Sequence, residues 1–242
     1  MVFTYERSEQ KFLLSQKAYE TIRQVFDNHM KEDQYGWQSI CNIYFDDDHS
    51  SLIRKSIENK KFKEKVRLRS YCATTANDDI VHFELKRKLN GITYKRRLTE
   101  KLSVVKDYLE GKTKTLGGKN PQVEAELKFF LNVNKLKPRI FISYDRIALK
   151  AESDSDLRIT FDTNLLYRRN NLNLSENYGT PYFTTPHYIM EIKTLSSLPL
   201  WLCNALTEQK IFSTSFSKYG KIFLLEGEKC LKQSTRINSA VS

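Results

Sequence analysis

The charged residues that could do chemistry occur in short runs in which they alternate with apolar residues. The run 65–69 reads KVRLR and the run 83–88 reads FELKRK. Because successive residues of a β-strand point to opposite faces of the sheet, each run would collect charges on one face. Four more sets show the same alternation: Arg7, Glu9 and Lys11; Lys95 and Arg97; Arg158, Thr160 and Asp162; Glu191 and Lys193. The sequence therefore predicts columns of Arg and Lys with occasional carboxylates.

Such columns predict a binding site for a polyanion. Two cations about 5 Å apart repel each other by on the order of 3 kcal/mol at an effective dielectric constant of 20. Phosphates would relieve this repulsion, because Arg binds phosphate oxygens in a bidentate manner and Lys adds a compact charge. The carboxylates Glu9, Glu84, Asp162 and Glu191 would weaken a simple phosphate site. They fit as oxygen ligands for magnesium or manganese ions that bridge the phosphates.

A simpler interpretation is that each charged column is the solvated face of an antiparallel strand whose other face covers the core. Solvated faces usually mix Thr, Ser and Gln with both charges, whereas these columns concentrate Arg and Lys. If the sheet closes into a barrel, one column of every strand faces the lumen. The interior of such a barrel would be cationic.

The elements that must position these columns are mostly strands, and the sequence predicts an antiparallel α+β fold. Predicted strands cover residues 3–14, 40–45, 65–71, 80–88, 93–98, 139–149, 157–162, 188–193 and 221–225. Amphipathic patterns predict helices from the N-cap Ser15 to about residue 30, from Ser50, over 102–110, over 121–131 and from Pro199. Residues 112–120 and 168–187 are predicted loops.

Composition points to a soluble globular protein. The 242 residues carry a net charge of +11 and are 40% hydrophobic, which predicts one domain over 1–228 and a polar tail over 229–242. No segment is apolar enough for a membrane-spanning helix or a signal peptide. Four scattered cysteines argue against a zinc site or a disulfide framework and favour the cytoplasm. Walker A, H-E-x-x-H and G-x-S-x-G motifs are absent from the sequence.

In the order of its motifs the chain resembles the VTC domain, the polyphosphate-polymerase branch of the triphosphate tunnel metalloenzymes. The motifs that carry the resemblance are R-x-E-x-K at 7–11, K-V-R-L-R-S-Y at 65–71, F-E-L-K-R-K at 83–88, Y-K-R-R at 94–97, Y-D-R at 144–146, D-L-R-I-T-F-D at 156–162, M-E-I-K at 190–193, P-L-W-L at 199–202 and F-S-K-Y-G at 216–220. Their number and order, over nearly the whole chain, make the resemblance specific.

The resemblance implies an eight-stranded antiparallel β-barrel tunnel with helices packed outside. It implies a nucleoside triphosphate, expected to be ATP, bound there with manganese or magnesium, and transfer of its γ-phosphoryl group to a growing polyphosphate chain. The implied catalytic cations are Lys86, Arg67, Arg69, Arg146, Arg158 and Lys218. The resemblance also implies that Lys11, Lys95 and Tyr144 bind substrate, with Tyr144 near the nucleotide base. The charged columns add Lys65, Arg97 and Lys193 as expected substrate-binding residues. The metal ligand implied by the resemblance is Glu191, and the charged columns add Glu84 and Glu9 as expected ligands.

One departure concerns the first motif. Hydrolytic relatives open with E-x-E-x-K, whereas this chain has Arg7 at the first position. This strand therefore carries fewer metal ligands than such a hydrolase would have, which favours the polymerase branch.

A second difficulty is the phase of the strand over 139–149. Arg146 and Tyr144 have the same parity as Ile140 and Ile142, so a regular strand would place Arg146 on an apolar face. Either a bulge near Ser143 or a lumen that is apolar at one end would resolve the conflict.

Two other functions stay open on the sequence. If water attacked the triphosphate, the same site would act as a metal-dependent tri- or polyphosphatase. Alternatively, basic strands with nearby aromatic residues could track the backbone of a nucleic acid. The interleaved carboxylates argue against nucleic acid, and Glu191→Ala separates the two classes because only a metal-dependent activity needs this carboxylate.

Overall fold

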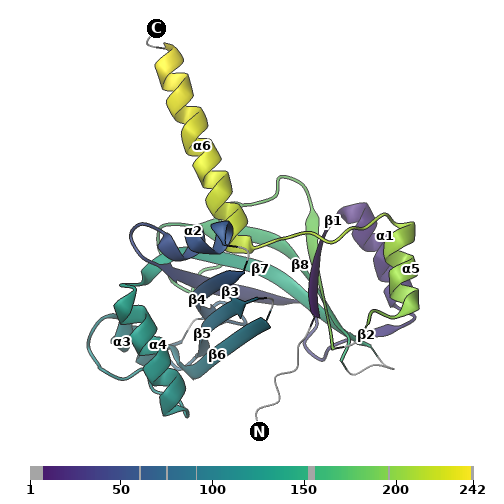
Figure 1. Ribbon diagram of the computed structural model, residues 1–242. Helices are drawn as coiled ribbons and strands as arrows, with labels where there is room; N and C mark the ends of the chain where they lie inside the picture. The colour runs from purple at the N-terminus through teal and green to yellow at the C-terminus, as the bar shows by residue number, and fades with distance from the viewer. Residues whose placement is uncertain are drawn as a thin grey trace.

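The computed structural model describes residues 8–59, 61–74, 76–90, 92–151, 156–195 and 197–240, so the predicted role of Arg7 lies outside the described residues. The α+β prediction is confirmed: one large antiparallel sheet carries helices on both faces (Figure 1). No helix in these ranges is long and apolar enough to span a membrane.

The sheet contains eight of the nine predicted strands in a mixed spatial order. Its path runs through β1 (Ser8–Ser15), β10 (His187–Thr194), β8 (Arg158–Arg168), β7 (Lys137–Ala151), β3 (Gln38–Asp46), β4 (Phe62–Ser70), β5 (Ile80–Leu89) and β6 (Ile92–Lys101). Two short strands were not predicted from the sequence: β2 (Met30–Glu32), which pairs with β7, and β9 (Thr180–Pro181), which pairs with β8. Within the described ranges β1 and β6 do not pair, so the sheet is open and the closed barrel is not confirmed.

Four helices cover the outer face of the sheet (Figure 1). The helices α3 (Leu102–Leu109) and α4 (Pro121–Val133) pack on β3 to β6, where Val105 and Leu127 join Phe83 in one apolar cluster. On the other half, α1 (Gln16–Phe26) and α5 (Leu200–Glu208) pack on β1, β10 and β8, where Phe26 and Leu202 join a second cluster. Two separate cores therefore fix the two halves of the sheet.

The remaining helices, α2 (Ser51–Glu58) and α6 (Lys218–Ala240), lie against the opposite face. A third apolar cluster joins Ile53 of α2 and Ile222 of α6 to strand residues such as Ile140 and Ile142. The predicted strand over 221–225 is wrong, because these residues form the second turn of α6. Only part of α6 packs on the sheet, and its far end projects from the body of the molecule (Figure 1).

The register also resolves the phase of Arg146. From Ile140 to Arg146 strand β7 keeps its alternation against β3, with Tyr144 opposite Ile40 and Ile142 opposite Asn42; the register of this ladder shifts only beyond Ile140. The bulge lies in β8, where Asn164 has a φ of 51° and the pairing with β7 shifts. Because Ile140 and Ile142 are covered by α2 and α6, the second resolution holds: this face is apolar at one end.

Candidate functional site

The ladder registers bring the predicted charged columns onto one face of the sheet, which we call the inner face. Arg67 lies opposite Glu84 and Glu84 opposite Arg97, while Lys11 lies opposite Glu191 at the other end of the sheet. Lys86 of β5 contacts Glu9 of β1, with 3.3 Å between Nζ and Oε2, although five strands separate these two in the sheet order. The sheet therefore curls, and its charged columns line the inside of the curve.

Glu84 is surrounded by cations from the neighbouring strands. Its oxygens accept from Arg67 Nε at 2.8 Å, Arg97 Nε at 2.7 Å and Lys95 Nζ at 2.7 Å. Its side chain is only 1% exposed. Burial would raise the pKa of Glu84, but the charges of Arg67 and Arg69 hold this pKa well below its usual range. Glu84 is thus an ionised hub that orients three cations.

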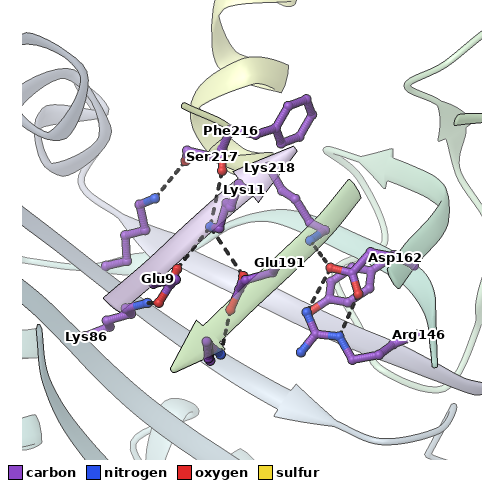
Figure 2. A network of polar contacts seen from close by, with 12 residues as sticks. Glu9, Lys11, Lys86, Arg146, Asp162, Glu191, Phe216, Ser217 and Lys218 are labelled. Atoms are coloured by element: carbon purple, nitrogen blue, oxygen red, sulfur yellow. Dashed lines mark hydrogen bonds and ion pairs between the residues drawn. The ribbon is translucent and has the colours of Figure 1, made fainter. Parts of the chain in front are cut away.

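Asp162 forms a second hub on β8. Its carboxylate accepts from Arg146 Nε at 2.6 Å and Nη2 at 2.8 Å, and also from Lys218 at the start of α6. Burial opposes ionisation, but Arg146 and then Lys218 lower the pKa of Asp162 to about 2. Figure 2 shows Arg146 and Lys218 approaching Asp162 from different elements.

The third group of charges lies on β1 and β10. Lys11 Nζ is 3.3 Å from Glu9 Oε1 and 3.5 Å from Glu191 Oε2, so its ammonium lies between the two carboxylates (Figure 2). Lys193 pairs with the other oxygen of Glu191. Burial disfavours the ionised form of Glu191, but Lys11 and Lys193 hold the pKa of this carboxyl well below its usual range.

Arg69 and Tyr144 are held differently, at the buried end of the inner face. Arg69 Nε donates to Asn42 Oδ1 at 2.9 Å, and Nη2 donates to the Tyr144 hydroxyl at 2.9 Å. The ring of Tyr144 lies 4.0 Å from Lys218 Nζ. Burial opposes ionisation of the phenol, but Arg69 and Arg146 lower the pKa of Tyr144 to about 8. Tyr144 is only 3% exposed, so its surroundings are cations rather than an open space for a nucleotide base.

Lys65 and Arg158 complete the predicted set. Lys65 Nζ donates to Ser217 Oγ at 2.7 Å, just before α6. Burial and then the charges of Lys11 and Lys86 lower the pKa of Lys65 to about 7. Arg158 lies opposite Lys193 on β10 and Lys150 on β7. The fifteen site residues named in the sequence analysis therefore all lie at the inner face of the curled sheet, with Lys218 contributed by α6.

The carboxylates differ in how they could hold a metal ion. In the described part of the chain no three His, Cys, Asp or Glu side chains are grouped to hold an ion. Glu84, whose oxygens are taken by three cations, does not group with the other two predicted ligands. Burial and then the nearby Glu191 would raise the pKa of Glu9, but Lys86 and Lys11 hold this pKa below its usual range. Both carboxylates contact Lys11.

Sequence reasoning missed several polar residues that position the cations. Asn42 is fully buried and also donates to the Ile142 carbonyl at 3.0 Å, and Ser217 contacts Lys65. Asn42 is a polar residue within the otherwise apolar run 40–45, on the same parity as Tyr44, and this could have indicated an inward position. No local pattern indicates Ser217, because its contact joins residues 152 positions apart.

Comparison with known proteins agrees with this architecture. The family model of the VTC domain matches residues 6–224, and no curated protein sequence is significantly similar to the chain. A Bacillus halodurans protein named as a candidate adenylate cyclase has a TM-score of 0.52 at 16% identity, covering 88% of this chain and 95% of its own. A Pyrococcus horikoshii protein has a TM-score of 0.45 at 13% identity, covering 91% and 99%. At 16% identity the likeness to the Bacillus halodurans protein concerns the fold alone.

Proposed function

The chain belongs to the VTC domain family, and from this premise we propose that it is a polyphosphate polymerase. In this proposal the inner face binds a metal-bound nucleoside triphosphate, with ATP as the expected nucleotide. An oxygen of the terminal phosphate of a growing polyphosphate chain attacks the γ-phosphorus, the bond from this phosphorus to the β–γ bridging oxygen breaks, and the nucleoside diphosphate leaves.

The observation that carries the proposal is the convergence of cations on the inner face of a curled sheet. Phosphoryl transfer depends on in-line placement and on neutralising the charge of the transferring group, without a covalent protein nucleophile. Arg67, Arg97 and Lys95 are pre-oriented by Glu84, and Arg146 and Lys218 by Asp162. These side chains require little reorganisation to bind phosphate oxygens.

Each group of cations has a distinct role in the proposal. Arg67, Arg69, Lys86, Arg146 and Arg158 orient the triphosphate and stabilise charge on the γ-phosphoryl group. Lys218 brings α6 into the same site through Asp162. Lys11, Lys65, Lys95, Arg97 and Lys193 hold the remaining phosphates. Tyr144 supports Arg69 through its hydroxyl, in place of the base contact expected from the resemblance.

Glu191 and Glu9 are the residues that would hold the divalent ion. Their fit rests on Lys11, whose ammonium already lies between the two carboxylates and shows that this position accepts positive charge. Carboxylate oxygens together with substrate phosphates are the ligands that magnesium and manganese prefer. When bound, the ion would neutralise charge on the phosphates. Glu84 is not included, because its side chain is only 1% exposed and lies among three cations, whereas the side chains of Glu191 and Glu9 are 10% and 23% exposed.

The proposal is tested by incubating the protein with ATP and manganese and separating the products on a gel. We expect ladders of polyphosphate from the wild type and a loss of at least about 100-fold in rate for Glu191→Gln, because an ion ligand is lost. Glu208→Gln, which changes an exposed carboxylate of α5, is the matched control and should keep the wild-type rate.

The products of the same assay distinguish a polymerase from a phosphatase and from a nucleic-acid-binding protein. Free phosphate without ladders would mean that water is the attacking group and that the enzyme is a phosphatase. The absence of any product from ATP, combined with tight binding of single-stranded nucleic acid, would contradict an enzymatic role.

A further inference from the structure

A cavity of about 440 Å³ lies where β8 exchanges one strand partner for another. Strand β8 pairs with β10 as far as Asp162 and with β9 from Leu166, and a loop over 182–186 connects β9 to β10. This loop, β8 and one residue of β7 line the cavity. Its volume is within the range of pockets that hold small organic ligands. None of the fifteen site residues is among the described residues that line it.

The charged group of this cavity is Asp145, the member of the Y-D-R motif that has no part in the inner face. On the ladder between β7 and β8, Arg146 pairs with Asp162, and Asp145 pairs with Thr163 on the next rung. Successive residues of a strand point to opposite faces of the sheet. The half-buried Asp145 is therefore directed away from the ion-pair hub of Asp162.

The carboxylate of Asp145 contacts neutral donors where the carboxylates of the inner face contact cations. Its Oδ1 accepts from Ser39 Oγ at 2.6 Å, and its Oδ2 accepts from Asn164 Nδ2 at 2.7 Å. Within the described ranges no Lys or Arg forms an ion pair with Asp145. A carboxylate offers about four lone-pair positions. Positions are therefore left for a ligand that brings both hydrogen-bond donors and positive charge.

The other polar groups of the lining also offer acceptors. His187 Nδ1 lies 2.9 Å from the Thr185 carbonyl, which can only accept, so Nδ1 carries the proton and the neutral ring leaves Nε2 as an acceptor. The Thr163 hydroxyl donates to the His187 carbonyl at 3.1 Å and keeps its own lone pairs. Leu166 and Pro181 add apolar surface. The cavity thus combines one negative charge, several acceptors and apolar walls.

We propose that this cavity binds a small alkyl amine in its ammonium form. The ammonium donates to Asp145, and the hydrocarbon chain lies along Leu166 and Pro181. Charge-assisted hydrogen bonds of this kind are among the stronger ones in proteins. The ligand lies outside the phosphate-binding machinery, so the proposal is independent of the proposed function.

The lining favours an organic ammonium over other charged ligands. Magnesium and calcium take several oxygen ligands, whereas Asp145 is the one carboxylate among the described residues that line the cavity. In the described part of the chain no three His, Cys, Asp or Glu side chains are grouped to hold an ion. An inorganic anion would be repelled by the carboxylate, and a neutral ligand would leave its charge unpaired.

The test is a titration by saturation-transfer NMR, with the full chain and three probes. These are n-pentylamine, its neutral counterpart 1-pentanol, and a capped Gly-Lys-Gly tripeptide, which carries the same ammonium on a polypeptide. Magnesium chloride, at constant ionic strength, is added as a competitor for the amine. A separate titration measures tripolyphosphate, the ligand expected at the inner face.

Two variants change the cavity in different ways. Asp145→Asn removes the charge and keeps an acceptor for Ser39. Thr184→Lys adds an ammonium at an exposed position of the loop, where it competes with the amine for Asp145. The controls are Asp78→Asn, at a side chain that is 78% exposed, and Thr207→Lys, at an exposed position of α5. Thermal melts establish that the variants fold, and Thr184→Lys decides the outcome if Asp145→Asn does not.

We expect saturable binding of n-pentylamine to wild type, with 1-pentanol and the tripeptide at least about tenfold weaker. Asp145→Asn and Thr184→Lys should each lower the affinity for n-pentylamine by about tenfold or more. Both controls should stay within about twofold of wild type. Tripolyphosphate should bind Asp145→Asn within about twofold of wild type, because this carboxylate lies outside the inner face.

Several results would overturn the proposal. Equal affinity of wild type and the two cavity variants for n-pentylamine would show that the amine does not bind at Asp145. Binding of 1-pentanol as tight as that of the amine, or displacement of the amine by magnesium, would show a different ligand class. Tighter binding of the tripeptide would assign the cavity to a lysine of a partner protein. A large loss of tripolyphosphate affinity in Asp145→Asn would make Asp145 part of the inner face.

Discussion

Lys65 is a cation of the inner face that contacts a hydroxyl, Ser217 Oγ, where its neighbours contact carboxylates. Its pKa of about 7 lies below the ordinary lysine value of about 10.4. Between these two pH values the unfolded chain binds a proton that the folded protein does not bind. Lys65 therefore makes folding more favourable as pH rises through this window, and this contribution is lost as pH falls toward 7.

A bound polyanion should reverse this effect by favouring the charged ammonium. At pH 8 we expect tripolyphosphate binding to be accompanied by proton uptake, and Lys65→Met to take up fewer protons. Calorimetric titrations in two buffers with different ionisation enthalpies measure the uptake. The control Lys17→Met should behave as wild type, and equal uptake by Lys65→Met and wild type would show that this lysine does not face the anion.

The second residue that gives a testable prediction is Glu84, which we interpret as an ion-pair hub and not as a metal ligand. Glu84→Gln leaves Arg67, Lys95 and Arg97 without their shared carboxylate. We expect a loss of about 2 kcal/mol or more in the free energy of unfolding at pH 7, measured with urea. The pKa of Glu84 is lowered on folding, so this loss should shrink as pH falls below about 4.

The metal-ligand interpretation predicts a different pattern for the same variant. In that case the stability difference between wild type and Glu84→Gln would appear only when manganese is added. A difference that is the same with manganese and with a chelator supports the ion-pair hub.

At the scale of elements, most strands and helices were predictable because each has a clear periodicity. The alternation at 65–69 and 83–88 placed Arg67 and Glu84 on one face, and the ladder confirms this. The strand prediction for residues 221–225 was wrong, because a short apolar run is compatible with either a strand or a helix. These residues belong to the first turns of α6, where Tyr219 and Ile222, three residues apart, are buried.

The curl of the sheet and the cover over its inner face were not predictable from local patterns. They depend on contacts between distant segments, such as Lys86 with Glu9 and Thr214 N with the Lys11 carbonyl. Hydrophobic periodicity reports which face of a strand is buried. It does not report which strands end the sheet or how far the sheet curls.

A prediction about how elements are joined concerns the start of α2. Ser50, the predicted start signal, has a φ of 57° and makes no side-chain capping bond. Asp46, at the end of β3, instead accepts from the Leu52 and Ile53 amides at 2.9 and 3.1 Å and from the Tyr219 hydroxyl. It therefore joins β3, α2 and α6. Asp46→Ala should lower the free energy of unfolding by about 2 kcal/mol or more.

Ser50→Ala is the matched control and should change stability by less than about 0.5 kcal/mol. Urea unfolding of both variants provides the comparison. Equal destabilisation by the two substitutions would show that the capping role belongs to neither residue in particular.

At the scale of the whole molecule, two outer cores hold an open sheet whose charged face is turned inward. The net charge of +11 is concentrated by this curvature, because cations from strands far apart in the sequence face one another. A protein arranged in this way gains stability when an anion binds its folded state. The fold thus explains why charges that repel one another are retained together.

The most direct test of triphosphate binding by the inner face is a calorimetric titration with tripolyphosphate that compares wild type with Arg158→Gln and with the exposed control Lys114→Gln. We expect saturable binding to one site, an affinity about tenfold lower for Arg158→Gln, and wild-type affinity for Lys114→Gln. Binding that does not saturate, or equal affinity of Arg158→Gln and wild type, would contradict the claim that the inner face binds a triphosphate.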